Sequence, residues 1–215
     1  MPQTLIGRIG AVLSLGLLLA AMALAGAWYF GDLPLGRSLE QVASGKPAIG
    51  GPFELVDQEG QTRRAEDFHG RYMLIYFGYT YCPDICPTTV AQMTQALDLL
   101  SEADPRRAER VVPVFITVDP ERDTVEALAD YAPLFHPELV ALTGTAEQVA
   151  AAASAYRVFY QRVESDEASD YLMDHSSFIF VMDPEGDYIT HFNHLSGAEE
   201  IAAGLAQRVR LAAGG

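Results

Sequence analysis

Apolar residues along the chain fall into short continuous runs, and the segments between the runs have the mixed apolar and polar spacing of helices. The runs YMLIYF (72–77) and VVPVFITV (111–118) are typical of buried strands, and SFIFVM (177–182) predicts a further strand. Helices are expected between and after these runs, at about 87–102, 123–135, 145–157 and 197–212. This alternation predicts an α/β fold with a central mixed sheet flanked by helices.

Turn residues predict two hairpins at the sides of this sheet. The segment PFELVDQEGQTR (52–63) is expected to turn at Glu59-Gly60, and the strands 177–182 and 187–192 are expected to pair across the turn DPEG. The first buried run leads directly into a loop with two cysteines and then into a helix. A loop of that kind at the end of a central strand favours a thioredoxin-like fold.

The N-terminal segment has the composition of a membrane span. Residues 9–30 are uncharged and mostly apolar, and as a helix they would be about 33 Å long, enough to cross a bilayer core. Arg8 precedes them, and the aromatic residues 28–30 end the run like an interfacial belt. A cleaved signal peptide is the alternative, because ALA at 23–25 is similar to a cleavage site. We expect an uncleaved anchor in residues 1–30.

The remaining chain divides into a linker and one domain. Residues 31–50 contain Gly, Pro and Ser without a clear period, which is typical of a tether, and residues 51–213 suit a single domain. With Arg8 on the cytoplasmic side, the anchor would cross the inner (cytoplasmic) membrane once. The domain would then face the periplasm or another extracytoplasmic space, where cysteines can be oxidised.

The charge of the chain narrows the class of partner. There are 29 Asp plus Glu residues against 14 Lys plus Arg residues, a formal net charge of −15. A surface this acidic repels phosphates, so the composition argues against nucleic acid as a partner and against a basic peripheral membrane protein.

The candidate chemistry lies in the segment YCPDIC (81–86), which contains both cysteines of the chain, Cys82 and Cys86. A disulfide across so short a loop would add little stability, because it removes little entropy from the unfolded chain. A structural zinc site usually needs four ligands, typically two such cysteine pairs, and this chain has one pair. Pro87 suits the first helical position, which would place Cys86 near the N-cap, where a thiolate is favoured. The pair therefore predicts a redox site, a metal site or both.

Four motifs resemble the Sco/SenC family in their order and spacing: YFGYTYCPDICPTT (76–89), VFITVDPERDT (114–124), LTGT (142–145) and DHSSFIFVMDPEG (174–186). The resemblance covers about residues 48–212. It implies a membrane-tethered thioredoxin-fold protein that binds copper and acts in the assembly of the copper centre of cytochrome c oxidase. Copper delivery, thiol reduction of that centre, or both remain open as its task.

The resemblance implies that Cys82, Cys86 and His175 bind the metal and that cytochrome c oxidase subunit II accepts it, while the copper donor stays open. The ligand types agree with this, because two thiolates favour Cu(I) and an imidazole suits both Cu(I) and Cu(II). His175 is expected on a loop before the strand 177–182, from which it could swing over the cysteines.

Two carboxylates are candidates for positions around these ligands. Asp174 either hydrogen-bonds and orients His175, as carboxylates beside metal ligands do, or is a solvated loop residue. Asp119 follows the strand 111–118 and either lies near the cysteines or caps the turn at Pro120. Asp123 and the next residue are expected to start the following helix.

Two other functions could use the same cysteines. A thiol–disulfide oxidoreductase would use them as a redox pair, but familiar redox sites have the shorter spacing C-x-x-C. A peroxiredoxin-type peroxidase has Thr three residues before its cysteine, whereas Thr80 is two residues before Cys82. We therefore predict a copper metallochaperone, with the oxidoreductase as the alternative. His191 and His194 have a spacing that could hold a metal, although on a strand or turn such spacing is usually incidental, and no role is assigned to His69 and His136.

Overall fold

The computed structural model describes residue 22, residues 48–164 and residues 171–211. Apart from residue 22, the predicted membrane anchor lies outside the described residues, as does the predicted linker up to residue 47. In the part of the chain that is described, no helix has both the length and the apolar character needed to cross a bilayer. A compact unit begins at Ile49.

The centre of this unit is a mixed sheet. Within the described residues it has seven strands in the order β2-β1-β5-β4-β3-β8-β9. They are β1 (Glu54–Asp57), β2 (Thr62–Arg64), β3 (Tyr72–Gly78), β4 (Val111–Thr117), β5 (Val140–Thr143), β8 (Phe178–Met182) and β9 (Tyr188–Asn193). β3, β4 and β5 are parallel, and the other neighbours are antiparallel. The predicted α/β class and mixed sheet are confirmed.

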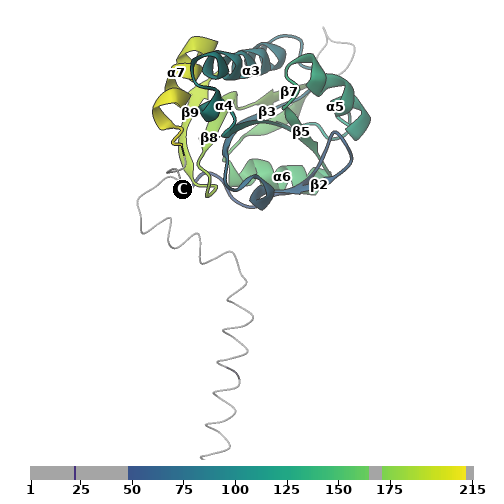
Figure 1. Cartoon of the computed structure of the whole chain (residues 1–215). Helices are drawn as coiled ribbons and strands as arrows, with labels where there is room; N and C mark the ends of the chain where they lie inside the picture. Colours follow the sequence, from purple (N-terminus) through teal and green to yellow (C-terminus); the bar gives the residue numbers. More distant parts are fainter. Residues whose placement is uncertain (1–21, 23–47, 165–170, 212–215) are drawn as a thin grey trace, which may run out of the picture. The chain divides into compact units, whose positions relative to one another are not determined.

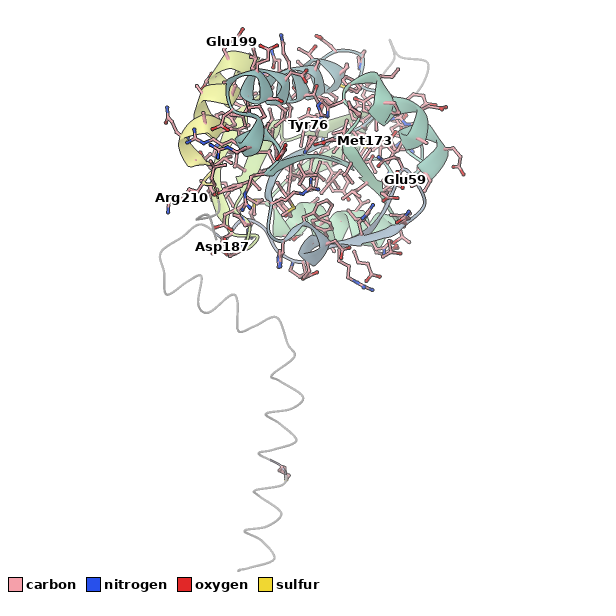
Figure 2. All side chains as sticks on the ribbon, in the orientation of Figure 1. Glu59, Tyr76, Met173, Asp187, Glu199 and Arg210 are labelled. Carbon is pink, nitrogen blue, oxygen red and sulfur yellow. The ribbon has the colours of Figure 1, made fainter. Side chains whose placement is uncertain are left out.

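The two central strands form the most deeply buried part of the molecule. Every residue of β3 and of β4 is buried, as their continuous apolar sequences predict. Their side chains pack across the sheet, for example Tyr76 against Phe115, with ring centres 6.4 Å apart. Figure 2 shows Tyr76 inside the domain and the charged residues Glu199 and Arg210 at its rim. The carboxyl ends of β3 and β4 therefore project from a rigid base.

Helices cover both faces of the sheet. They are α3 (Ile85–Ala103), α4 (Pro105–Ala108), α5 (Val125–Tyr131), α6 (Ala146–Ala155) and α7 (Ala198–Arg208), with 3-10 turns η1 (Ala65–Phe68) and η2 (Ala132–Leu134). α3 and α7 pack together on one side of the sheet and α6 lies on the other (Figure 1). The α3 helix, which follows the cysteine loop, is thus packed against both the sheet and α7.

Two helix ends show how local sequence sets the boundaries. Thr145 caps α6 at the predicted start, where its hydroxyl accepts from Gln148 N and the Gln148 side chain accepts from Thr145 N. The helix expected over 123–135 is shorter, because Pro133 follows α5 in the 3-10 turn η2 and cannot donate a backbone hydrogen bond.

A second sheet of two strands was not predicted. It consists of β6 (Tyr160–Val163) and β7 (Leu172–His175), which pair in antiparallel register with Tyr160 opposite His175. The main chain reaches it through Arg157, which has a left-handed φ of 58° directly after α6. This hairpin is important because its last residue is one of the predicted metal ligands.

Candidate metal and redox site

The cysteine loop joins β3 to α3 at the carboxyl edge of the sheet. The helix begins at Ile85 with Asp84 at the N-cap, two residues earlier than predicted, so Pro87 is the third helical residue. A proline is tolerated there because the first N–H groups of a helix have no partner within the helix. As a result, Cys86 lies near the N-cap as predicted, as the second residue of the first helical turn.

This helix start determines how the two sulfurs are arranged. The backbone N–H of Cys86, in the first turn of the helix, donates to Cys82 Sγ at 3.3 Å, so this helix terminus stabilises negative charge on the Cys82 sulfur. Cys86 is fully buried, whereas Cys82 is partly exposed. Both cysteines are free thiols.

Gly78 makes room for the buried sulfur. A β-carbon at this position would lie 3.2 Å from Cys86 Sγ and only 2.8 Å from a ring carbon of Tyr76. Contacts under 3.0 Å require something to move, so a larger residue would displace either the ring or the sulfur. The last residue of β3 therefore has to be small for Cys86 to pack against the sheet.

His175 reaches the cysteines from the β6–β7 hairpin. Its Nε2 atom lies 3.2 Å from Cys86 Sγ, although 89 residues separate the two in sequence. Its Nδ1 atom lies 3.2 Å from the carbonyl oxygen of Ser176, which can only accept, so we assign the ring hydrogen to Nδ1. The Nε2 lone pair then faces the sulfur. The expected position on a loop is wrong, because His175 is paired with Tyr160 at the end of β7.

Aromatic rings surround the imidazole. The rings of Tyr76 and Tyr79 meet it edge-on, with ring centres 6.0 Å and 5.9 Å away. Burial and the neighbouring cysteines together raise the pKa of Tyr79 to about 12, and burial also raises the pKa of Tyr76. Both tyrosines therefore stay neutral at physiological pH and shield the site from water.

The electrostatics of the cysteine pair are unequal. The Cys86 thiol, through its hydrogen bond, and two backbone N–H groups hold the pKa of Cys82 at about 3, although burial acts to raise it. The pKa of Cys86 is raised far above its ordinary value by Cys82 and by burial. Cys82 is therefore the thiolate at neutral pH, which reverses the expectation that the helix would activate Cys86.

The three predicted ligands are thus neighbours, linked through Cys86. Among the residues that are described, however, no group of three or more His, Cys, Asp and Glu side chains already has an arrangement able to hold a metal ion. By the chemical type of their donor atoms, two thiols and an imidazole with a free lone pair suit a soft, thiophilic metal ion.

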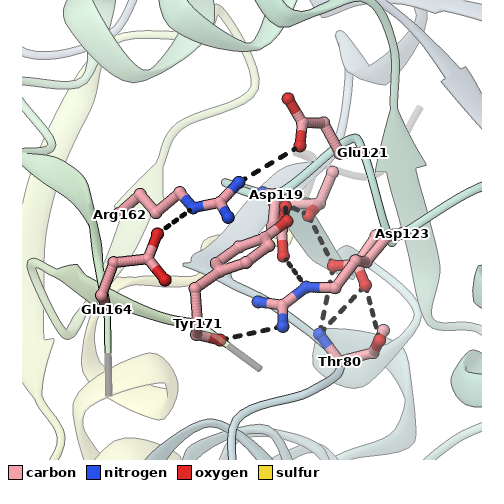
Figure 3. A network of polar contacts seen from close by, with 9 residues as sticks. Thr80, Asp119, Glu121, Asp123, Arg162, Glu164 and Tyr171 are labelled. Carbon is pink, nitrogen blue, oxygen red and sulfur yellow. Dashed lines mark hydrogen bonds and ion pairs between the residues drawn. The ribbon is translucent and has the colours of Figure 1, made fainter. Parts of the chain in front are cut away.

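The structure separates the two predicted carboxylates. Asp174 is exposed and precedes His175 in a strand, where successive side chains point to opposite faces. Asp119 is buried, accepts a hydrogen bond from the Tyr171 hydroxyl at 2.8 Å and forms an ion pair with Arg122 (Figure 3). Its carboxylate contacts these two side chains, which makes it part of a polar network and not a simple cap for the turn.

Asp123 has a role that the sequence did not indicate. It is fully buried and accepts hydrogen bonds from the Thr117 hydroxyl at 2.6 Å and from Thr80 N at 3.1 Å (Figure 3). Thr124 is the N-cap of α5 instead, accepting from Ala127 N. Burial raises the pKa of Asp123. The carboxylate therefore ties the start of the cysteine loop to the end of β4.

The other histidines lie elsewhere. Nδ1 of His191 is 2.6 Å from the Tyr188 hydroxyl within β9, and His136 lies 3.6 Å from Asp98. Neither contact involves the cysteine loop, which agrees with assigning them no role in the site.

Comparison with known proteins identifies the family. The SCO1/SenC family model matches residues 41–210. The human protein "SCO1 homolog, mitochondrial" is 42% identical over 166 residues, which are 77% of this chain and 54% of the human protein. This chain therefore spans little more than half of that relative's length.

Two solved structures with copper bound are similar to the domain. ScoI of Arabidopsis thaliana matches with a TM-score of 0.70 and 39% identity, over 74% of this chain and 97% of that one. ScoI of Bradyrhizobium japonicum matches with a TM-score of 0.67 and 39% identity, over 74% and 99%. The motifs around the cysteine loop and His175 had indicated the same family, and the chain belongs to the SCO1/SenC family.

Proposed function

We propose that this protein is a copper metallochaperone that binds copper as cargo through Cys82, Cys86 and His175. The observation that carries the proposal is the contact of Cys86 Sγ with His175 Nε2 at 3.2 Å, with the Cys82 sulfur on the adjoining turn. The copper-bound structures of the two relatives support the choice of metal.

The residues would divide the binding between them. Cys82 supplies a thiolate without a change of protonation, because its pKa is about 3. Cys86 has to release its proton before it can bind, since its pKa is raised. His175 offers the Nε2 lone pair, and two soft sulfurs with one imidazole accept Cu(I), while the imidazole also suits Cu(II). Three ligands leave a coordination position open for a receiving protein.

The setting of this chemistry is also part of the proposal. Residues 9–30 would anchor the chain in the inner membrane with a single pass, and residues 31–50 would tether the domain on the extracytoplasmic side. The receiving protein would be cytochrome c oxidase subunit II. Its support is the family itself, of which one member is described as belonging to the cytochrome c oxidase assembly proteins.

The alternative function, a thiol–disulfide oxidoreductase, is favoured by one observation. A partly exposed thiolate at Cys82 lies beside the buried thiol of Cys86, which is the arrangement of an attacking and a resolving cysteine. Cys82 would attack a target disulfide, and Cys86 would then displace the target thiolate. The two cysteines would lose two electrons and the target disulfide would gain them.

Copper stoichiometry on the reduced, detergent-purified full chain tests both functions. We expect one copper per chain in the wild type, and loss of stable binding in Cys82→Ser and in Cys86→Ser. Insulin reduction, measured in parallel, reports the alternative. Normal copper binding by either serine variant would contradict the metallochaperone, and rapid insulin reduction without copper binding would establish the oxidoreductase.

A further inference from the structure

Arg122 lies between the two segments that carry the proposed ligands. Its Nε atom donates to the Asp119 carboxylate, and its Nη1 atom donates to the carbonyl oxygen of Tyr171 at 2.9 Å. The side chain is only 11% exposed. Two hydrogen bonds in different directions fix the plane of the guanidinium, because its donors form a rigid fork.

The flat faces of this guanidinium contact three tyrosine rings. Its Cζ atom lies 3.6 Å from the ring centre of Tyr171, 4.8 Å from that of Tyr81 and 5.7 Å from that of Tyr79. Tyr171 directly precedes β7, which ends in His175, and the other two tyrosines belong to the cysteine loop. One side chain therefore touches both segments through cation–π contacts.

The contacts of Arg122 continue to the imidazole itself. Tyr79 meets the His175 ring edge-on at 5.9 Å, and Tyr81 is bonded directly to Cys82. We propose that Arg122 is a positioning residue, which fixes the cysteine loop against β7 and so keeps His175 Nε2 beside Cys86 Sγ. As far as copper is concerned, this inference rests on the proposed function.

The chain offers a matched control in Arg162. Its Cζ atom also lies 3.6 Å from the ring centre of Tyr171, and its ion pairs are with Glu121 and Glu164 (Figure 3). Its stacking contact is with Tyr171, whereas Arg122 stacks on the cysteine-loop tyrosines as well. Replacing Arg162 therefore removes an arginine from the same tyrosine ring but leaves the contacts of Arg122 with the cysteine loop intact.

The affinity for Cu(I), measured by competition with a chromophoric chelator, tests the positioning role of Arg122. Arg122→Gln should weaken binding roughly tenfold, as loss of a group that orients a metal ligand does, and Arg162→Gln less than about twofold. In the His175→Ala background, Arg122→Gln should have no further effect, because its action passes through the imidazole. Equal losses with and without His175, or equal losses for the two arginines, would overturn the inference.

A copper-free measurement separates this inference from the proposed function. In the reduced protein, the nuclear Overhauser effect between the Tyr79 and His175 rings should vanish in Arg122→Gln and persist in Arg162→Gln. If the wild type bound no copper, the proposed function would fail, and this signal would still decide the role of Arg122. Persistence of the signal in Arg122→Gln would contradict the positioning role.

A milder variant covers the case in which Arg122→Gln does not fold, since that change leaves Asp119 buried without its ion pair. Tyr81→Leu keeps the ion pair and removes one stacked ring whose side chain is 60% exposed. We expect it to weaken Cu(I) binding by about two- to fivefold, the equivalent of one exposed cation–π contact. An unchanged Cu(I) affinity in Tyr81→Leu would count against the positioning role of Arg122.

Discussion

The cysteines and the histidine of the site are supported by very different parts of the molecule. The cysteine loop follows β3, in which every residue is buried, and leads into a helix that packs against both the sheet and α7. His175 ends a two-stranded hairpin whose residues are at best partly buried. The comparison indicates that the sulfurs are held by the core of the domain, whereas the imidazole depends on a few contacts at its edge.

The largest difference between the two regions should appear in stability. Leu74→Ala in β3 removes a fully buried side chain and should lower the free energy of unfolding by about 2–5 kcal/mol. Met173→Ala in β7 removes a partly buried one and should cost less than about 1.5 kcal/mol. Urea denaturation followed by circular dichroism measures both. Equal costs would mean that the hairpin is as firmly held as the central sheet.

The acidity of Cys82 should depend mainly on the Cys86 thiol and less on the hairpin that carries His175. Since its pKa is about 3, its rate of alkylation by iodoacetamide should change little from pH 8 to pH 5. An ordinary thiol would slow by roughly several hundredfold over that range. His175→Ala should keep the flat profile, because the first cause of the low pKa is the Cys86 thiol, and Cys86→Ala should restore the steep one. A steep profile in the wild type would refute the assignment.

Removal of the imidazole should weaken the metal site without abolishing it. His175→Ala leaves two thiolates, which can hold Cu(I) in linear geometry, so we expect a loss of about 10- to 100-fold in Cu(I) affinity. Cu(II) prefers nitrogen or oxygen donors and oxidises bare thiolates, so the thiolate-to-Cu(II) absorption band should disappear. An unchanged band would show that His175 is not a ligand.

The smallest expected effects concern the two carboxylates near the loop and the hairpin. Asp123→Asn should lower the free energy of unfolding by about 1–2 kcal/mol, because one of the groups on Thr80 and Thr117 loses its acceptor. Asp174→Asn should change it by less than about 0.5 kcal/mol, since that side chain is exposed. Any loss of copper affinity in Asp174→Asn would then report on the orientation of His175.

The sequence predicted the core side of this comparison better than the hairpin side. Continuous apolar runs predicted β3 and β4, and the turn DPEG predicted the pairing of β8 with β9. The segments YQRV and LMDH of β6 and β7 have no such pattern, because each is short and lies partly in solvent. Strands of that kind are specified by their partner and not by their own periodicity.

Prediction from the sequence was limited in the same way for the residues around the proposed ligands. Cys82, Cys86 and His175 were predicted from motifs, and the structure brings them together. Asp123 was expected to start a helix, since nothing local indicates that its carboxylate binds Thr80, 43 residues away. The stacking of Arg122 on tyrosines from two segments is likewise a product of the fold. Contacts between distant segments, which a single sequence does not display, account for what was missed.

Gly78 gives the core side of the site a further property. The space that a β-carbon would take at the end of β3 is occupied by the approach of Tyr76 and the Cys86 sulfur. The volume available to the Cys86 sulfur therefore depends on the fact that Gly78, at the end of β3, has no β-carbon. A single added methyl group at Gly78 would change how deeply the Cys86 sulfur is buried without replacing any proposed ligand, and with it the balance between a concealed and an accessible thiol.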